Sequence, residues 1–362
     1  MFDTSWKFYL TGETAWEAMF EACAAATKSI DFEQFIFEYD SIGRRFYDLF
    51  VAKVKEGVRV RLIIDGGGSY TFYNSRPHRE LVKAGIEVKV FSPISPWRIN
   101  NISSFFFRNH RKLLVVDKAV AFTGGVGIEE RMRHWRDTHL SVSGPVVAEF
   151  SQAFELMWRT ISAGRYIRFK RNWKVVGDFA LLINSPRFRQ RHIYHEYMRR
   201  LRHAKRYIYL TSPYFVPSQR LFFWLMRKAR RGLDVRLLLP ERSDYDMVDA
   251  AGRSYYRLLL NSGVKIYHYP SGLKREQMLH VKSAVVDDAW SAVGSCNLDS
   301  LSFVYNYEDD LISVDTRFIG EVREQFINDL KNAKEVLSKD WSRRSPLQKF
   351  YELLTWPFHW ML

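Results

Sequence analysis

The chain has 362 residues, of which 47% are hydrophobic, so it is long enough to bury two ordinary cores. Its 55 Lys and Arg residues exceed its 40 Asp and Glu residues and give a formal charge of +15, which indicates an anionic partner, either nucleic acid or acidic lipid. Aromatic residues make up 16% of the chain, which favours lipid. Two cysteines, Cys23 and Cys296, are too few for a disulfide framework or a metal-binding cluster.

The sequence predicts no targeting signal. The first residues, MFDTSWKFYLTG, have neither the basic nor the apolar region of a signal peptide. No run of about 18 apolar residues occurs, so no transmembrane helix is expected. We therefore expect any membrane contact to be peripheral, on the cytoplasmic side of the cell membrane.

In chain order, the first predicted element is an amphipathic helix, with Thr14 and Glu17 at the spacing of a capping box. Strand patterns with intervening helices follow at 25–37, 56–69, 84–91 and 110–125. Each of these strand patterns returns later in the chain. The four counterparts are 202–215, 231–244, 262–269 and 280–295.

This duplication predicts an α/β protein built from two halves related by a pseudo-two-fold axis, each half a mixed sheet flanked by helices. We expect the halves at 1–170 and 171–340, joined through the basic stretch 164–178, and an apolar tail at 341–362. Generic α/β repetition would explain recurring strands. It would not explain why polar residues such as His110 and His280 recur at a constant offset of 170.

The recurring polar residues form the motif HxKxxxxD. Because strand side chains alternate faces, His110 and Lys112 point the same way and can bind and attack a phosphate, whereas Asp117 has the opposite parity. We therefore expect the motif aspartates to order the adjacent turns. Two copies that meet across the pseudo-two-fold axis would make one site at the interface between the halves. The second copy consists of His280, Lys282 and Asp287.

A metal site is not expected here, because protonated lysines repel cations. A single HxK is most often a satisfied strand histidine beside a solvated lysine, but two copies with equal spacing and a glycine turn after each argue against that interpretation.

The chain resembles the phospholipase D superfamily and, within it, the bacterial cardiolipin synthases. The two motifs carry the superfamily resemblance, and WRDTH at 135–139, SPYFVP at 212–217 and SFVYNYEDD at 302–310 carry the narrower one. The resemblance covers nearly the whole chain, from about residue 8 to the C-terminus.

The resemblance implies phosphodiester exchange through a covalent phosphohistidine, with no cofactor. His110 would be the nucleophile and His280 the general acid and then base, although the near-symmetric sequence leaves the reverse order open. Lys112 and Lys282 would hold the phosphate oxygens.

The resemblance also implies a carboxylate that orients each histidine. The matching residues are Asp137 and Glu308, which lie 27 and 28 residues beyond the respective histidines. Ser295 and Asn297 would bind phosphate. The family's asparagine is replaced in the first half by Gly127, a loss of about 0.5–1.5 kcal/mol if one hydrogen bond to the phosphate is missing.

Two segments suggest contact with lipid. The segment 92–110 mixes aromatic and basic residues and could enter the headgroup region, or its aromatics could pack on the body of the protein. The run 350–362 is strongly apolar but too short to span a bilayer, and it could be an interfacial anchor or a cover for the core.

The functional hypothesis is a phosphatidyltransferase that makes cardiolipin from two phosphatidylglycerol molecules at a membrane surface. The alternatives are a hydrolytic phospholipase D or another phosphatidyltransferase, a nuclease of the same fold, and a non-catalytic binding protein with a decayed site. Nucleic acid is not the expected partner, and the oligomeric state is not indicated by the sequence.

Overall fold

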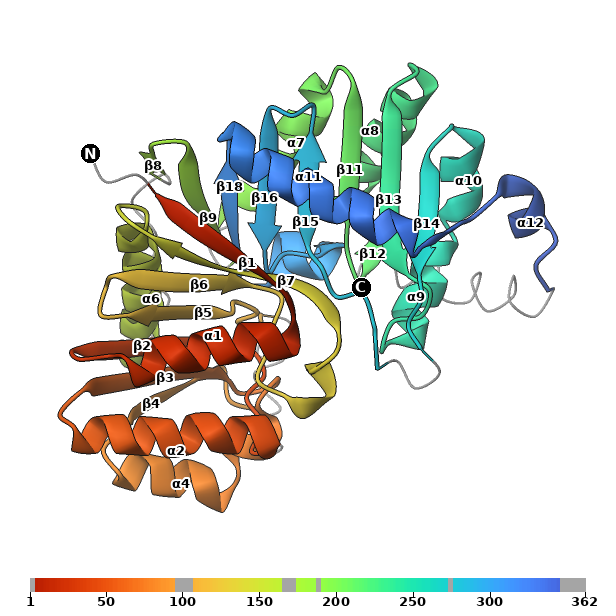
Figure 1. Cartoon of the computed structure of the whole chain (residues 1–362). Helices are drawn as coiled ribbons and strands as arrows, with labels where there is room; N and C mark the ends of the chain where they lie inside the picture. Colours follow the sequence, from red (N-terminus) through yellow and green to blue (C-terminus); the bar gives the residue numbers. More distant parts are fainter. Residues whose placement is uncertain (1–3, 95–106, 165–173, 187–189, 273–275, 346–362) are drawn as a thin grey trace.

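The first half of the chain folds into a seven-stranded mixed sheet with helices on both faces (Figure 1). The computed structural model describes residues 4–94, 107–164, 174–186, 190–272 and 276–345. The strand order is β1-β7-β6-β5-β2-β3-β4. The strands are β1 (Ser5–Thr11), β2 (Ser29–Gln34), β3 (Arg59–Asp65), β4 (Glu87–Phe91), β5 (Leu113–Val116), β6 (Val120–Gly124) and β7 (Arg136–Ser143). The helices are α1 (Gly12–Ala24), α2 (Ser41–Lys55), α3 (Tyr70–Tyr73), α4 (Arg76–Lys83), the 3-10 turn η1 (Glu130–Met132) and α6 (Val147–Ser162).

The second half forms a ten-stranded mixed sheet and a separate two-stranded one. The strands are β8 (Val175–Val176), β9 (Phe179–Ser185), β10 (Gln190–Arg191), β11 (Tyr207–Thr211), β12 (Phe215–Val216), β13 (Asp234–Pro240), β14 (Lys265–Tyr269), β15 (Ser283–Val286), β16 (Trp290–Gly294), β17 (Leu298–Asp299), β18 (Asp309–Ser313) and β19 (Lys334–Glu335). The helices are α7 (His192–His203), α8 (Gln219–Arg230), α9 (Asp246–Arg253), α10 (Tyr256–Asn261), the π-helical turn η3 (Leu301–Tyr305), α11 (Thr316–Lys331) and α12 (Ser338–Ser342).

The two large sheets repeat one topology. Strands β7-β6-β5-β2-β3-β4 of the first sheet correspond in order to β18-β16-β15-β11-β13-β14 of the second. The pairings match as well, because β2–β3 and β11–β13 are parallel whereas β2–β5 and β11–β15 are antiparallel. The predicted fold of two mixed-sheet halves is confirmed. The first half ends with α6 and the second sheet begins at residue 175, so the predicted junction lies partly outside the described residues.

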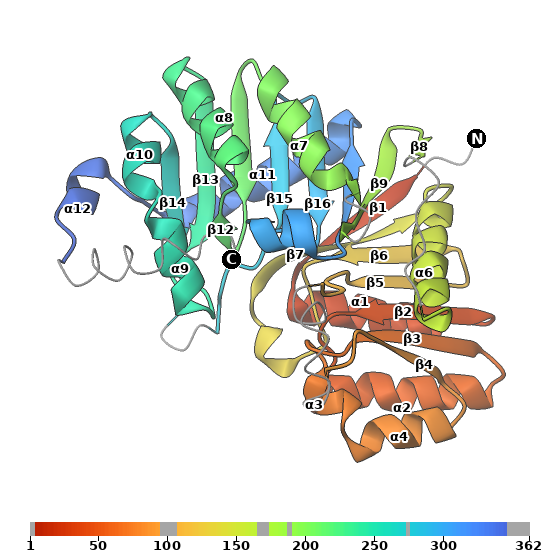
Figure 2. The same ribbon diagram turned by 180° about the vertical axis from the view of Figure 1, so that it is seen from behind.

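Helices cover both faces of each sheet, and α6 and α11 contribute to a core shared by the halves. In the first half α1, α2 and α4 lie on one face and α6 on the other, and in the second half α7, α8 and α10 lie opposite α11 (Figures 1 and 2). Buried residues of β5, β7 and α6 belong to the same apolar cluster as residues of β9, β15 and α11. The halves therefore pack against each other through a shared core, and the site lies between them.

The first helix begins earlier than its sequence predicts. Thr11, not Thr14, is the N-cap, and the side chains of these two residues complete the capping box. Gly12 follows at the first helical position, where a Cβ atom would lie 2.3 Å from the carbonyl oxygen of Met132. Close packing against η1 thus sets the start of α1, and the predicted capping box at Thr14 and Glu17 is wrong.

Within the described residues, no helix is both long and apolar enough to cross a membrane. The predicted lipid-contacting segments fall largely outside the described residues, at 95–106 and 346–362.

Candidate active site

The two motif histidines reach one pocket because each motif segment hydrogen-bonds to the other half of the chain. The backbone N–H of His110 donates to the carbonyl oxygen of Tyr307 at 2.9 Å, and that of His280 donates to the carbonyl oxygen of Arg136 at 2.7 Å. Short parallel bridges join the same segments. Both histidine side chains line a single cavity of about 320 Å³ at the interface, as the duplication predicts.

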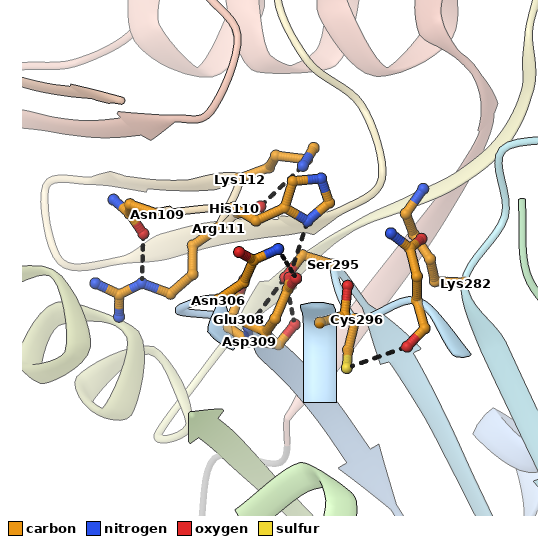
Figure 3. A network of polar contacts seen from close by, with 12 residues as sticks. Asn109, His110, Arg111, Lys112, Lys282, Ser295, Cys296, Asn306, Glu308 and Asp309 are labelled. Carbon is orange, nitrogen blue, oxygen red and sulfur yellow. Dashed lines mark hydrogen bonds and ion pairs between the residues drawn. The ribbon is translucent and has the colours of Figure 1, made fainter. Parts of the chain in front are cut away.

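A buried carboxylate contacts each histidine, and the partners are exchanged between the halves. Nδ1 of His110 lies 3.0 Å from Glu308, and Nδ1 of His280 lies 2.7 Å from Asp137. Figure 3 shows Glu308 joined to the ring of His110. The spacing along the chain suggests that each carboxylate serves the histidine upstream of it. The structure pairs it instead with the histidine of the other half, because the segments cross at the interface.

Burial keeps both imidazoles neutral at neutral pH. Desolvation lowers the pKa of His280 to about 4, and the nearby Lys282 ammonium lowers it further, against the opposing effect of Asp137. Desolvation also lowers the pKa of His110, although Glu308 opposes it. With a carboxylate at Nδ1, each neutral ring carries its proton there and presents Nε2 as a base.

The two motif lysines are fully buried beside the histidines. Nζ of Lys112 donates to the carbonyl oxygen of His110 at 2.8 Å, and Nζ of Lys282 donates to that of His280 at 2.7 Å. Nζ of Lys282 also lies 2.9 Å from Nε2 of His280. Desolvation lowers the pKa of Lys112 to about 8 and that of Lys282 to about 7. These two ammoniums make the pocket attractive to an anion.

The walls of the cavity are mainly aromatic and apolar. The ring of Phe35 lies 4.8 Å from that of His110, and the ring of Trp135 lies 5.2 Å from that of His280. A few polar groups interrupt these walls. The lining residues besides His110, Lys112 and His280 are Phe35, Ile36, Arg108, Arg131, Met132, Trp135, Tyr214, Asp244, Tyr245, Val248, Asn297, Asp299, Leu301, Ser302 and Asn306.

Of the two predicted phosphate-binding residues, only Asn297 lines the cavity. Ser295 is completely buried behind it, and its hydroxyl donates to Glu308, as Figure 3 shows. The backbone N–H of Asp309 donates to the same hydroxyl at 3.0 Å. Ser295 therefore holds the carboxylate that contacts His110 and does not face the substrate space, which corrects its prediction as a phosphate ligand.

The motif aspartates do not reach the cavity either, which corrects their placement with the catalytic groups and agrees with their parity. Asp117 has a φ of +53° and Asp287 a φ of +59°, in the tight turns after β5 and β15. Their carboxylates accept hydrogen bonds from backbone N–H groups of the preceding loops and so fasten the motif hairpins to the sheet. The donors are Thr27, Lys28 and Ser29 for Asp117, and Lys205, Arg206 and Tyr207 for Asp287.

Gly127 departs from the family pattern because the first half uses its position for packing. Its carbonyl oxygen accepts a hydrogen bond from Nε1 of the buried Trp16 at 2.8 Å. A Cβ atom at Gly127 would lie 3.4–3.5 Å from Met132 and Ile36. A thioether and an aliphatic side chain thus stand on the side where the second half presents Asn297.

A buried polar layer behind the site was not predicted from the sequence. Glu33 contacts Asn109 and Arg111, each at 2.7 Å, and Thr123 donates to Asp309 of the other half at 2.6 Å. The alternation about the first motif could have indicated part of this layer, because Asn109 and Arg111 must face away from the histidine and lysine between them. Nothing in the spacing indicated the partners.

Comparison with known proteins shows the family to which the chain belongs. Residues 19–158 and 197–330, one stretch in each half, match the family model described as "Cardiolipin synthase, PLD-like domain". The chain belongs to this family.

Curated members of the cardiolipin synthase family are similar to the chain over most of its length. The cardiolipin synthase of Geobacillus sp. is 32% identical over 94% of this chain and 69% of its own. Cardiolipin synthase A of Pseudomonas fluorescens is 34% identical over 94% of this chain and 71% of its own. These matches confirm the resemblance drawn from the motifs.

A solved structure supports the fold alone. The phosphatidylserine synthase of Haemophilus influenzae superimposes with a TM-score of 0.71 at 14% identity, over 98% of this chain and 92% of its own. The two-sheet architecture of this cardiolipin synthase-type chain is therefore a shared fold at low sequence identity.

Proposed function

We propose that the chain is a phosphatidyltransferase that makes cardiolipin from two phosphatidylglycerol molecules and releases glycerol. One observation carries the proposal. Two imidazoles, each with a buried carboxylate at Nδ1, line one cavity with the buried ammonium of Lys112, and the buried Lys282 contacts His280. The names of the relatives support cardiolipin as the product.

In the first step Nε2 of His110 attacks the phosphorus of the donor, and a phosphorus–nitrogen bond forms as the bond to the glycerol oxygen breaks. The leaving oxygen takes a proton from Nε2 of His280. The phosphate anion in the pocket stabilises the imidazolium and so raises the pKa of His280 from its low value in the free protein. Lys282, with a pKa of about 7 and hydrogen-bonded to the same nitrogen, can supply that proton.

In the second step a hydroxyl of the second phosphatidylglycerol gives its proton to His280 and attacks the phosphorus. The bond to His110 breaks, and cardiolipin leaves. Lys112 stabilises the charge on the non-bridging oxygens in both steps, and Lys282 takes back through His280 the proton that it supplied in the first step. The aromatic walls near both histidines exclude water and favour the alcohol as acceptor.

We assign the attack to His110 because of an asymmetry between the rings. Nε2 of His280 already accepts a hydrogen bond from Lys282, whereas no hydrogen bond to Nε2 of His110 is found among the described residues. Its lone pair faces the cavity and can reach phosphorus.

The test is to incubate the purified chain with vesicles of labelled phosphatidylglycerol and to resolve the lipids. Cardiolipin and glycerol in equal amounts are expected. Phosphatidic acid without cardiolipin would identify a hydrolase, and cleavage of single-stranded DNA with untouched lipid would identify a nuclease. Activity should survive EDTA because the two lysines supply the positive charge that a metal would otherwise provide.

We also infer that residues 1–170 and 171–340 act as two halves of one catalytic unit, which binds as a peripheral protein to the anionic cytoplasmic membrane surface. The formal charge of +15 supports this, since each Lys or Arg near an acidic leaflet contributes about 1 kcal/mol. Sedimentation with phosphatidylglycerol vesicles should fall as salt is raised, and binding equal to that of neutral vesicles would contradict the inference.

A further inference from the structure

A tyrosine–carboxylate pair stands on the His280 side of the cavity and has no part in the chemistry described so far. The hydroxyl of Tyr214 donates to Oδ1 of Asp244 at 2.5 Å, and Oδ2 of Asp244 lies 3.4 Å from the guanidinium of Arg131. All three line the cavity with His280. The ring of Tyr214 lies 6.3 Å from that of His280, so the pair stands beside the acid–base group.

Asp244 is unexpected in this cavity, because a carboxylate repels the negatively charged phosphodiester that the cavity is proposed to bind. Asp244 is not required to orient a histidine, because Asp137 and Glu308 already occupy both Nδ1 positions. Its side chain is 10% exposed, so it is not a solvated surface acid. An ionised carboxylate only accepts hydrogen bonds and has room for more than one donor on each oxygen. Asp244 therefore suits a ligand that brings hydrogen-bond donors.

The pair belongs to one half only. Phe215 pairs with Leu298 in the second half as Phe37 pairs with Ile128 in the first. The residue before each phenylalanine is consequently equivalent, and it is Tyr214 in the second half and Ile36 in the first. Both line the cavity, so the His280 side is polar and acidic where the equivalent wall in the first half is apolar.

This asymmetry coincides with the side on which the alcohol must lie. In an in-line displacement the leaving oxygen stands opposite the attacking nitrogen of His110. That position is beside His280, which protonates it. The remainder of the alcohol then extends toward the residues that surround His280, including Tyr214 and Asp244.

We propose that Asp244, held by Tyr214, forms the subsite for the exchanged alcohol and accepts a hydrogen bond from a second hydroxyl of its glycerol group. The proposal rests on the proposed function and deepens it. The subsite would recognise the glycerol that leaves in the first step and the glycerol group of the acceptor in the second. A polyol fits better than an ammonium headgroup, because the guanidinium of Arg131 and the buried Lys282, which both interact electrostatically with Asp244, repel a cation there.

The experiment compares acceptors on the whole chain with vesicles of acyl-labelled phosphatidylglycerol. Isotopically labelled glycerol, 1-propanol and ethanolamine are supplied as competing acceptors, and the three phosphatidyl products are quantified. The unaltered chain should prefer glycerol to both others. Asp244→Asn should lower kcat/KM for glycerol at least about tenfold more than that for 1-propanol, because a site built to bind a hydroxyl discriminates against an alcohol that lacks it. Tyr214→Phe should lower the same ratio, by a smaller factor.

The matched control is Asp246→Asn, two residues away on α9, whose carboxylate is exposed and does not line the cavity. It should leave the glycerol-to-propanol ratio unchanged. If the glycerol-to-propanol ratio is unchanged in Asp244→Asn, or if both alcohols lose equally, the subsite proposal is wrong. The proposed function would still stand if the unaltered chain transfers the phosphatidyl group. A preference of the unaltered chain for ethanolamine would also overturn the subsite proposal. If Asp244→Asn does not fold, the ratio in Tyr214→Phe decides.

Discussion

The first and second halves of the chain place their histidines in the same way but surround them with different side chains. Both histidines donate a backbone N–H across the interface and meet a carboxylate of the opposite half. Among the residues that the structure describes, a lysine contacts Nε2 of His280 but none contacts Nε2 of His110. The shared backbone thus sets the distance between the reacting groups, and the unshared side chains divide the roles of nucleophile and acid–base.

The supporting residues show the same divergence. Gly125 and Ser295 are equivalent, but a Cβ atom at Gly125 would lie 2.1 Å from Asp137, whereas Ser295 binds the longer side chain of Glu308 through its hydroxyl. Asp137 lies so close to the backbone that only glycine fits at position 125, whereas Glu308 leaves space for the hydroxyl of Ser295. The halves have diverged in compensating pairs, which single positions would not reveal.

The largest expected effect concerns the histidines. His110→Ala and His280→Ala should each lower cardiolipin formation at least about 10³-fold, since each removes a covalent or proton-transfer step. The comparison predicts that they differ in one respect. A phosphatidyl adduct, mapped by peptide mass spectrometry, should form on His110 in the His280→Ala variant and should be absent from the His110→Ala variant. An adduct on His280 would reverse the assignment.

The next effect concerns the exchanged carboxylates. Glu308→Gln and Asp137→Asn should each lower kcat about 10²-fold, because the ring beside each loses its fixed orientation and the charge that stabilises its protonated form. Glu308→Gln should slow formation of the adduct on His110, and Asp137→Asn should slow proton transfer by His280. Rapid-quench measurement of adduct formation separates these cases, and the opposite assignment would argue against the crossed pairing.

A smaller effect, on stability, is expected for the motif aspartates. Asp117→Ala and Asp287→Ala should each lower the free energy of unfolding by about 3 kcal/mol, because three backbone N–H groups lose a charged acceptor. Activity per folded molecule should stay within a few-fold of the unaltered chain. Urea unfolding measures the first and lipid analysis the second, with the exposed Asp48→Ala as control. A loss of activity as large as that of the histidine variants would place these aspartates in the chemistry.

The smallest effect concerns an equivalent pair of buried ionisable groups. His139 pairs with Gly124 where Asp310 pairs with Gly294. Desolvation lowers the pKa of His139 to about 4 and raises the pKa of Asp310 well above its ordinary value. The unfolded chain binds the His139 proton more readily than the folded one, so His139 destabilises the fold as pH falls from 7 toward 4. The folded chain binds the Asp310 proton more readily, so the stability due to Asp310 is lost as pH rises.

His139→Leu should therefore make the loss of unfolding free energy between pH 7 and pH 5 smaller by about 2 kcal/mol. Asp310→Asn should act at high pH, where it should reduce the loss of unfolding free energy as pH rises. Urea unfolding across the pH range measures both, with the exposed His134→Leu as control. Equal pH slopes in all the variants would show that neither group is held in its neutral form.

Sequence reasoning reached most of the site because the chain is duplicated. The constant offset of 170 identified both motifs, and strand parity separated the histidines and lysines from Asp117 and Asp287. Prediction from the sequence failed for contacts that cross the interface between the halves. Spacing indicated two carboxylates but could not say which histidine each one serves. It also placed Ser295 in the substrate space, because the sequence of a glycine turn does not show which way the side chain of the next serine points.

The fold class, the two half-sites and the residue types that bind phosphate could be predicted from the sequence, because periodicity and repetition are properties of the chain alone. The exchange of carboxylates, the contact of Lys282 with Nε2 of His280, and the position of Tyr214 and Asp244 beside His280 became visible only in the folded structure. These depend on how two sheets cross and pack. The paired HxKxxxxD motifs are thus one site whose two ends differ, and that difference comes from side chains that meet only when the halves come together.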